Sequence, residues 1–173
     1  MGMPSTRFDR PLDVLATCHA RIERELVILE GLDTYLVAHG CDSHARSLSR
    51  DVLEYFDTAG EMHHKDEDDD LFPLVRRCAA AQGRADVAAV IDELEREHET
   101  MHLQWRRLRL RLQAIAAGDG RLDGDELTKF AWLYRRHMER EAAVVMPFAR
   151  NSLERRQIAA LGKRMAARRR GPP

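Results

Sequence analysis

Histidines recur in this sequence at positions where an amphipathic helix would bury them. Four segments each carry one histidine among their apolar residues: His19, His63, His98 and His137. An imidazole ring that is removed from water needs a hydrogen-bond partner or a metal ion. One such ring is most often a hydrogen-bonded core residue, but four are difficult to satisfy separately. Shared coordination of metal would satisfy all four, so the pattern indicates a metal site inside a helical protein.

Two of these histidines are followed, four positions later, by a glutamate. His63 precedes Glu67, and His137 precedes Glu141. Residues four apart lie about 40° apart around an α-helix, so both members of each pair can point into the protein. The two pairs belong to an internal repeat, in which FDTAGEMHHKDEDDDLFP aligns without gaps with FAWLYRRHMEREAAVVMP. The repeat indicates two helix pairs related by a pseudo-twofold axis, which would frame two equivalent metal positions.

The acidic run beside His63 is ambiguous by spacing alone. His64 and Asp68 are also four apart, but only His63 and Glu67 keep the same offset from a proline as their counterparts in the repeat. We therefore expect His64 to be peripheral, together with a solvated acidic face. The residues expected on the periphery are His64, Asp66, Asp68 and Asp69.

The third segment contains HETMH, His98 to His102, which matches the H-E-x-x-H motif of zinc peptidases. In that interpretation His98 and His102 would bind zinc, and Glu99 would be the general base. It leaves both His–Glu pairs unexplained. We favour instead His98 as a ligand in the bundle centre, with His102 as a lower-ranked ligand because it lies one position off the apolar stripe.

Apolar residues at steps of three and four predict four long amphipathic helices. Their expected ranges are 11–40, 43–83, 87–118 and 127–148, with a bend or an end at Pro73. The first three segments are expected to end at Gly40, Gly83 and Gly118. Short connections between them indicate an all-α fold, an up-down antiparallel four-helix bundle with a short C-terminal helix. The expected divisions are an N-terminal extension over 1–10, the bundle over 11–150, and a basic helix and tail over 151–173.

The basic tail begins at Arg155 and reads RRQIAALGKRMAARRRGPP. We expect a solvated helix there, capped by Asn151 or Ser152. One alternative is that the basic residues contact nucleic acid or another acidic surface. Another is that the apolar residues of the segment dock on the bundle or on a second copy of the chain. Those residues are Leu153, Ile158, Leu161 and Met165. We also expect His39 and His44, which flank Gly40, to be exposed.

Composition narrows the class of protein. The 173 residues carry a net charge of −1, which does not favour nucleic-acid binding, and no apolar run approaches the roughly 20 residues of a membrane span. Three widely spaced cysteines, Cys18, Cys41 and Cys78, predict reduced thiols. The first residues lack the apolar core of a signal peptide, so we expect a cytoplasmic protein.

The combined motifs resemble the hemerythrin-like, HHE cation-binding family. The pattern consists of a histidine on the first helix, H-x-x-x-E before LFP on the second, histidines on the third, and H-x-x-x-E before VMP on the fourth. The resemblance covers about residues 11–150 and implies a non-haem di-iron centre, with iron favoured over zinc or manganese. Nitrogen and oxygen donors without thiolate suit these metals. The expected ligands are His19, His63, Glu67, His98, His102, His137 and Glu141.

The resemblance also implies alternatives for function. The oxygen-carrying hemerythrins use H-x-x-x-x-D on the last helix, whereas this chain has H-x-x-x-E, which argues against reversible oxygen carriage. We expect a protein that interacts with O2, NO or iron, as a sensor or in iron handling. An enzyme-like role in redox chemistry or iron-centre repair is the alternative, and whether the chain is an enzyme stays open. A second copy or a redox partner is also left open.

Overall fold

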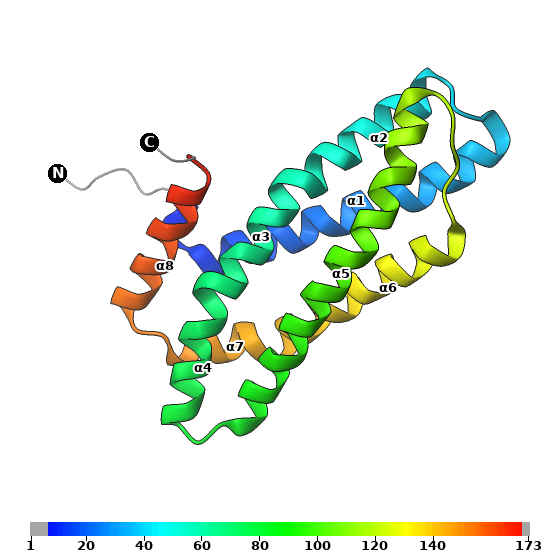
Figure 1. The fold of residues 1–173 in the computed structure, drawn as a ribbon. Coiled ribbons are helices and arrows are strands. Elements are labelled where there is room, and N and C mark those ends of the chain that lie inside the picture. Colours follow the sequence, from blue (N-terminus) through cyan, green and yellow to red (C-terminus); the bar gives the residue numbers. More distant parts are fainter. Residues whose placement is uncertain (1–6, 171–173) are drawn as a thin grey trace. The chain divides into compact units, whose positions relative to one another are not determined.

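The computed structural model describes residues 7–170, and the regular secondary structure in these residues is helical, with no strand among them. The prediction of an all-α chain is therefore confirmed. The first six residues of the predicted N-terminal extension and the last three of the predicted tail lie outside the described residues. Figure 1 traces the helices in chain order.

The helical segments follow the predicted ranges closely. A 3₁₀ turn, η1, precedes the first helix, and the π-helical turns η2, η3 and η4 interrupt the second and fourth predicted helices without breaking them. The bounds are η1 Arg7–Asp9, α1 Pro11–His39, α2 Ser43–Tyr55, η2 Phe56–Gly60, α3 Glu61–Lys65, η3 Asp66–Leu71, α4 Phe72–Ala81, α5 Ala85–Ala117, α6 Gly124–Arg140, η4 Glu141–Val145, α7 Met146–Ser152 and α8 Arg155–Arg168.

The predicted glycine stops are confirmed by backbone conformation. Gly40, Gly83 and Gly118 have φ values of 69°, 66° and 101°, which only glycine adopts without a steric penalty. The predicted cap of the last helix is wrong. Glu154 caps α8 in a capping box, in which its backbone N–H donates to Oε1 of Gln157 at 2.8 Å. Asn151 and Ser152 instead belong to α7.

Both prolines of the repeat follow a π-helical turn. Pro73 lies just after η3, and Pro147 just after η4. Proline has no N–H, and its ring clashes with the carbonyl group four residues earlier in a regular α-helix. A wider turn ahead of the proline relieves that clash, and the helix continues. The two segments of the internal repeat therefore share a local structure as well as a sequence pattern.

The chain divides into two compact units. Unit 1 contains the residues up to His19, Met62–Glu95 and the residues from Glu139 onward, and unit 2 contains Ala20–Glu61 and Arg96–Met138. Each unit has its own apolar core. In unit 1 the core includes Leu15, Phe72, Val75, Ile91, Leu94, Val145, Leu161 and Met165. In unit 2 it includes Ile22, Leu26, Leu29, Phe56, Met101, Leu108 and Phe130.

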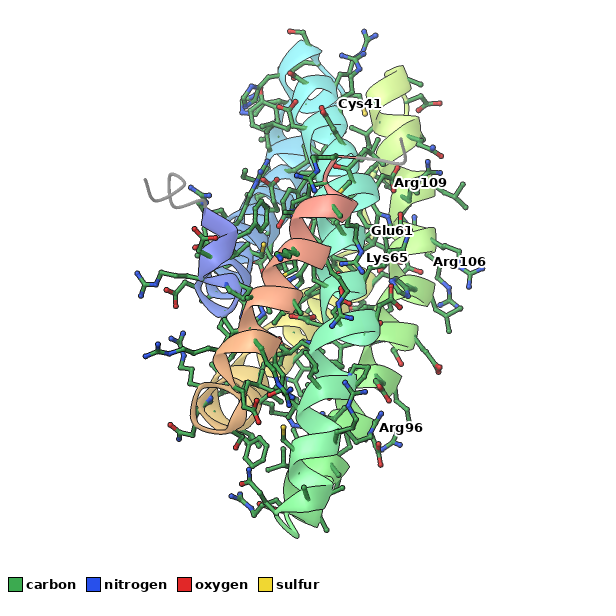
Figure 2. All side chains as sticks on the ribbon, turned by 90° about the vertical axis from the view of Figure 1, so that its left-hand side faces the viewer. Cys41, Glu61, Lys65, Arg96, Arg106 and Arg109 are labelled. Carbon is green, nitrogen blue, oxygen red and sulfur yellow. The ribbon has the colours of Figure 1, made fainter. Side chains whose placement is uncertain are left out.

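Aromatic packing and a hydrogen bond from a tryptophan join the helices of unit 2. The rings of Phe56 and Phe130 lie 5.5 Å apart, and the indole of Trp105 donates to Asp57 at 2.9 Å. Arg96 and Arg106 are exposed and point outward from α5 (Figure 2), as expected for the polar face of an amphipathic helix.

The basic helix α8 packs into unit 1. Leu161 and Met165 are fully buried in its core, and Ile158 packs against it. The expectation of a solvated helix is therefore wrong for α8, and its alternative, docking of the apolar stripe, is confirmed. The hydrophobic effect explains the difference, because this stripe is long enough to bury two complete side chains.

No helix among the described residues combines the length and the apolar character that crossing a membrane requires.

Candidate metal centre

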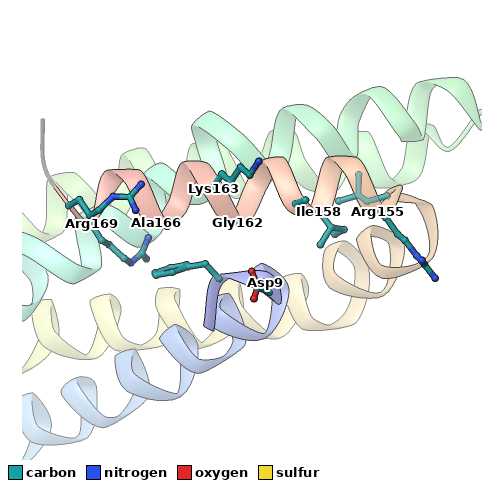
Figure 3. Close-up of a pocket in the computed structure, with 11 residues that line it drawn as sticks. Asp9, Arg155, Ile158, Gly162, Lys163, Ala166 and Arg169 are labelled. Atoms are coloured by element: carbon teal, nitrogen blue, oxygen red, sulfur yellow. The ribbon is translucent and has the colours of Figure 1, made fainter. Parts of the chain in front are cut away.

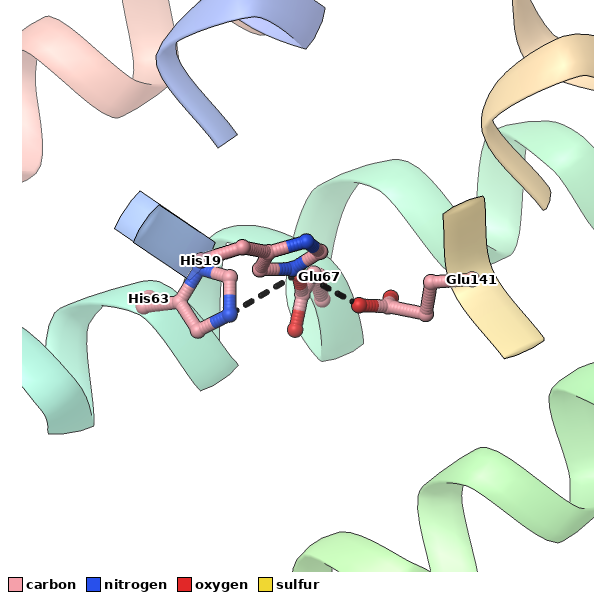
Figure 4. A group of neighbouring side chains, drawn as sticks. All are labelled: His19, His63, Glu67 and Glu141. Carbon is pink, nitrogen blue, oxygen red and sulfur yellow. Dashed lines mark ion pairs between the residues drawn. The ribbon is translucent and has the colours of Figure 1, made fainter. Parts of the chain in front are cut away.

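Unit 1 gathers four of the predicted ligands around one point. His19 comes from α1, His63 from α3, Glu67 from η3 and Glu141 from η4. Each offers one donor atom, and these atoms all lie within 4.8 Å of one another. Figure 4 shows the four side chains converging from three separate stretches of the chain.

The contacts in this cluster join imidazole nitrogens to carboxylate oxygens. Nε2 of His19 lies 2.9 Å from Oε2 of Glu141 and 3.6 Å from Oε1 of Glu67. Nε2 of His63 lies 3.2 Å from the same Oε1 of Glu67. The His19 and His63 rings meet edge to face, with centroids 5.0 Å apart. Two imidazoles therefore share two carboxylates.

The π-helical turns place both glutamates. Glu67 is the second residue of η3, and Glu141 is the first residue of η4. Single π-turns inside α-helices are frequent at functional sites, because they re-aim the side chains that they carry. The same local device thus delivers a carboxylate to the cluster in both halves of the repeat.

Burial makes the charge balance of the cluster important. Glu67 and Glu141 are fully buried, and the side chain of His19 is 13% exposed. Burial alone would lower the pKa of His19, but hydrogen bonds to Glu141 and Glu67, together with their charges, outweigh it and raise the pKa to about 10. A proton on His19 therefore compensates part of the buried negative charge, and a bound cation would take over that role.

The donor set fits a transition-metal ion. Two imidazole nitrogens and two carboxylates, without a thiolate, suit iron, manganese or zinc. Two buried carboxylates are unfavourable neighbours unless a positive charge lies between them. A bound divalent cation would therefore stabilise these buried residues.

Unit 2 contains a second pair of the predicted ligands. Nε2 of His98 on α5 and Nε2 of His137 on α6 lie 3.0 Å apart, and each residue is 1% exposed. Nδ1 of His137 lies 3.1 Å from Oε2 of Glu97. Metal-binding histidines commonly hold a carboxylate with their second ring nitrogen, which fixes the tautomer and leaves the other nitrogen for the metal. Glu97 gives His137 that arrangement.

His102 lies elsewhere. It is exposed on α5, and among the described residues it belongs to neither the His19 cluster nor the His98–His137 pair. His98 is buried and faces His137, so the two histidines of HETMH do not share an environment. The geometry therefore speaks against the zinc-peptidase interpretation.

The expectation of a peripheral acidic face is partly wrong. Asp66 is fully buried and Asp70 is 4% exposed, and both are ion-paired with arginines of α8 and its C-cap. His64 is also buried, at 3% exposed. Asp69 is exposed as expected. The arginines stand about 100 residues later in the sequence, so spacing within the acidic run carries no signal for these pairs.

Other expectations agree with the structure. His39 and His44 are exposed, and Cys18, Cys41 and Cys78 are free thiols. Glu97 was not recognised from the sequence, because its role depends on α6 and not on a motif within α5.

Comparison with known proteins gives two matches. Residues 10–149 match the hemerythrin HHE cation binding domain family. An uncharacterized protein of Haemophilus influenzae is 30% identical over 164 residues, which cover 94% of this chain and 91% of that protein. The family match contains every predicted ligand and ends before α8 begins.

Proposed function

Because the chain belongs to the hemerythrin HHE cation-binding family, we propose that it is a non-haem iron protein that binds two iron ions per chain. The observation that carries this proposal is the buried cluster of His19, His63, Glu67 and Glu141, whose donor atoms lie within 4.8 Å of one another. The predicted up-down four-helix arrangement forms part of the same proposal.

The number of ions rests on the duplication of the ligand pattern. The repeat assigns an H-x-x-x-E motif to each half of the chain. The cluster in unit 1 supplies donors for one ion, and the pair of His98 and His137, backed by Glu97, supplies imidazole donors for a second. Zinc and manganese accept the same donors, and the family resemblance favours iron.

Iron in such a site supplies redox chemistry and the binding of a small diatomic molecule, and we propose O2 or NO as that molecule. The residues of the chain prepare the site for a cation. Glu67 and Glu141 contribute negative charge inside the protein, and His63 holds Oε1 of Glu67. A bound cation would displace a proton from His19, because Nε2 of His19, which faces both carboxylates, would become a ligand.

The cellular role that we propose is the sensing of O2 or NO, or the handling of iron. The chain would respond to its ligand through the occupancy or redox state of the site, and would pass that change to a partner.

Elemental analysis tests the proposal. Protein purified without chelators and reconstituted anaerobically with Fe²⁺ should contain two ions per chain. Glu67→Ala should lower that content sharply, because it removes a carboxylate from the cluster. Glu99→Ala is the matched control: Glu99 is exposed and is the general base of the rejected peptidase interpretation. One tightly bound zinc ion, unaffected by Glu67→Ala, would contradict a di-iron protein.

A further inference from the structure

The π-turn that carries Glu67 is held from outside the family domain by α8. Asp66 and Asp70 both pair with Arg168, so they face α8, while Glu67, the residue after Asp66, faces the His19 cluster. One short turn therefore has a metal-facing carboxylate and two carboxylates that face α8.

Three arginines at the end of the chain bind those two carboxylates. Arg169 donates from Nη2 to Oδ2 of Asp66 at 2.6 Å, and Arg168 donates to the other oxygen of Asp66. Arg168 also donates to Asp70 at 2.8 Å, and Arg164 pairs with Asp70 at 2.8 Å. Charge-assisted hydrogen bonds to both oxygens of a buried carboxylate fix its orientation as well as its charge. We call this set of five residues the arginine clasp.

The position of α8 along its own axis is fixed by close packing against η1. A Cβ atom added at Gly162 would lie 1.9 Å from the carbonyl oxygen of Phe8, so only glycine allows this approach. The guanidinium of Arg169 lies over the Phe8 ring, 5.3 Å from its centroid. Figure 3 shows Gly162 and Arg169 on the face of α8 that lies over η1. This contact sets the register that aims the arginines at η3.

We propose that Arg168 and Arg169 are positioning residues for the metal centre: by holding Asp66, they set the orientation of the turn that presents Glu67. The three arginines of the clasp lie C-terminal to the matched family range of 10–149, so they are an addition to the HHE domain. This inference rests on the proposed function, because it concerns the affinity of the same site for metal.

Electrostatics and positioning predict opposite results for the removal of these arginines. Arg168 and Arg169 are positively charged, so replacing them with neutral residues should strengthen cation binding if only their charge matters. If they position Glu67, the same replacement should weaken cation binding. Outer-shell partners of metal ligands commonly contribute about 10- to 100-fold to affinity.

The experiment compares the full-length chain with R168Q/R169Q, using Co²⁺ alone as a visible spectroscopic probe. The double variant should bind Co²⁺ about 10- to 100-fold more weakly in competition with a chromophoric chelator, and the bound Co²⁺ should show an altered visible spectrum. R156Q is the control, because Arg156 lies on α8 but is 83% exposed and pairs only with Glu154 among the described residues. R168K should bind Co²⁺ more weakly than the wild type, since lysine lacks the planar guanidinium that can donate to two carboxylates at once.

The outcomes separate this inference from the proposed function. If the wild type binds no metal, the proposed function fails. If the wild type binds Co²⁺ and R168Q/R169Q binds it equally or more tightly with an unchanged spectrum, the clasp has only a structural role and the inference fails. Circular dichroism checks folding at the assay temperature, and the single variant R169Q, which keeps Arg168 on Asp66, provides a milder test if the double variant unfolds.

Discussion

Glu67 and Glu141 are fully buried, and a proton on His19 would partly balance the charge of their carboxylates. His19 lies within hydrogen-bond distance of Glu141 and remains 13% exposed, so it is the member of the cluster that solvent can reach. The protonation of His19 and the binding of a cation are therefore competing ways of neutralising the same carboxylates.

The metal-free protein should show this competition as a shifted titration. The pKa of His19 is raised from 6.5 to about 10 in the folded protein. Because the folded-state pKa is the higher one, the stability that His19 contributes is fully present below pH 6.5 and is lost as the pH rises through about 10. Heteronuclear NMR of the metal-free protein should find His19 protonated at pH 8. A neutral imidazole at that pH would show that the carboxylates are already neutral or more hydrated than in the structure.

At the scale of the helices, the glycines of α1 and α8 offer a matched pair. Gly162→Ala would force a Cβ against the backbone of η1, where the carbonyl group cannot move aside easily. We expect Gly162→Ala to destabilise the protein by roughly 1–3 kcal/mol. Gly31 lies inside α1 with nothing within 4 Å of an added Cβ, so Gly31→Ala should stabilise the protein by about 1 kcal/mol.

Urea unfolding of the two glycine variants measures both effects. Opposite signs would support the close packing of α8 on η1. Equal small effects would mean that α8 can move away from η1 without loss of stability, and would remove the fixed register on which the arginine clasp depends.

The sequence predicted the helices well because their information is local. Apolar steps of three and four, with glycine stops at Gly40, Gly83 and Gly118, define the segments without reference to the rest of the chain. Four ligands, His19, His63, Glu67 and Glu141, follow from the same stripes and meet in unit 1. The pairing of Asp66 with Arg168 and Arg169 could not be predicted. These arginines follow Asp66 by 102 and 103 positions, and residues so far apart share no local pattern.

The π-turns do have a local signal in the sequence, which a search for regular α-helical periodicity does not identify. His63, Glu67, Leu71 and Val75 are all buried at successive steps of four, and so are His137, Glu141, Val145 and Ala149. Three such steps would drift by about 120° around a regular α-helix, so they should not all face inward. A run of steps of four is therefore the sequence signature of the wider turn that the structure contains.

For the whole molecule, the exposed edge of His19 bears on how the proposed iron protein should respond to oxygen. A carrier must keep water and protons from its iron, whereas here 13% of the side chain of His19, a predicted ligand, is exposed to solvent. The last helix also has H-x-x-x-E instead of the H-x-x-x-x-D of the carriers. We therefore expect the ferrous protein to oxidise in air and to need a reductant for recovery.

A spectroscopic cycle measures this reactivity. The protein is reduced anaerobically, exposed to oxygen and then degassed under vacuum. Persistence of the ferric spectrum until dithionite is added is the expected result. Return of the colourless ferrous spectrum on degassing alone would restore oxygen carriage as the leading function.

Because of the π-turns, the fold depends on the number of residues in these segments as well as on their types. A π-turn contains one residue more than an α-turn. The extra residue changes the direction of the side chains that follow, so that residues on both sides of the turn face the interior. Deleting one residue from η4 would restore an ordinary α-turn and rotate the following helix by about 100°, which would carry Phe148 and Ala149 out of the core of unit 1. The interval from glutamate to proline is six residues in both halves of the repeat, and in each half the π-turn that contains the glutamate lies ahead of the proline.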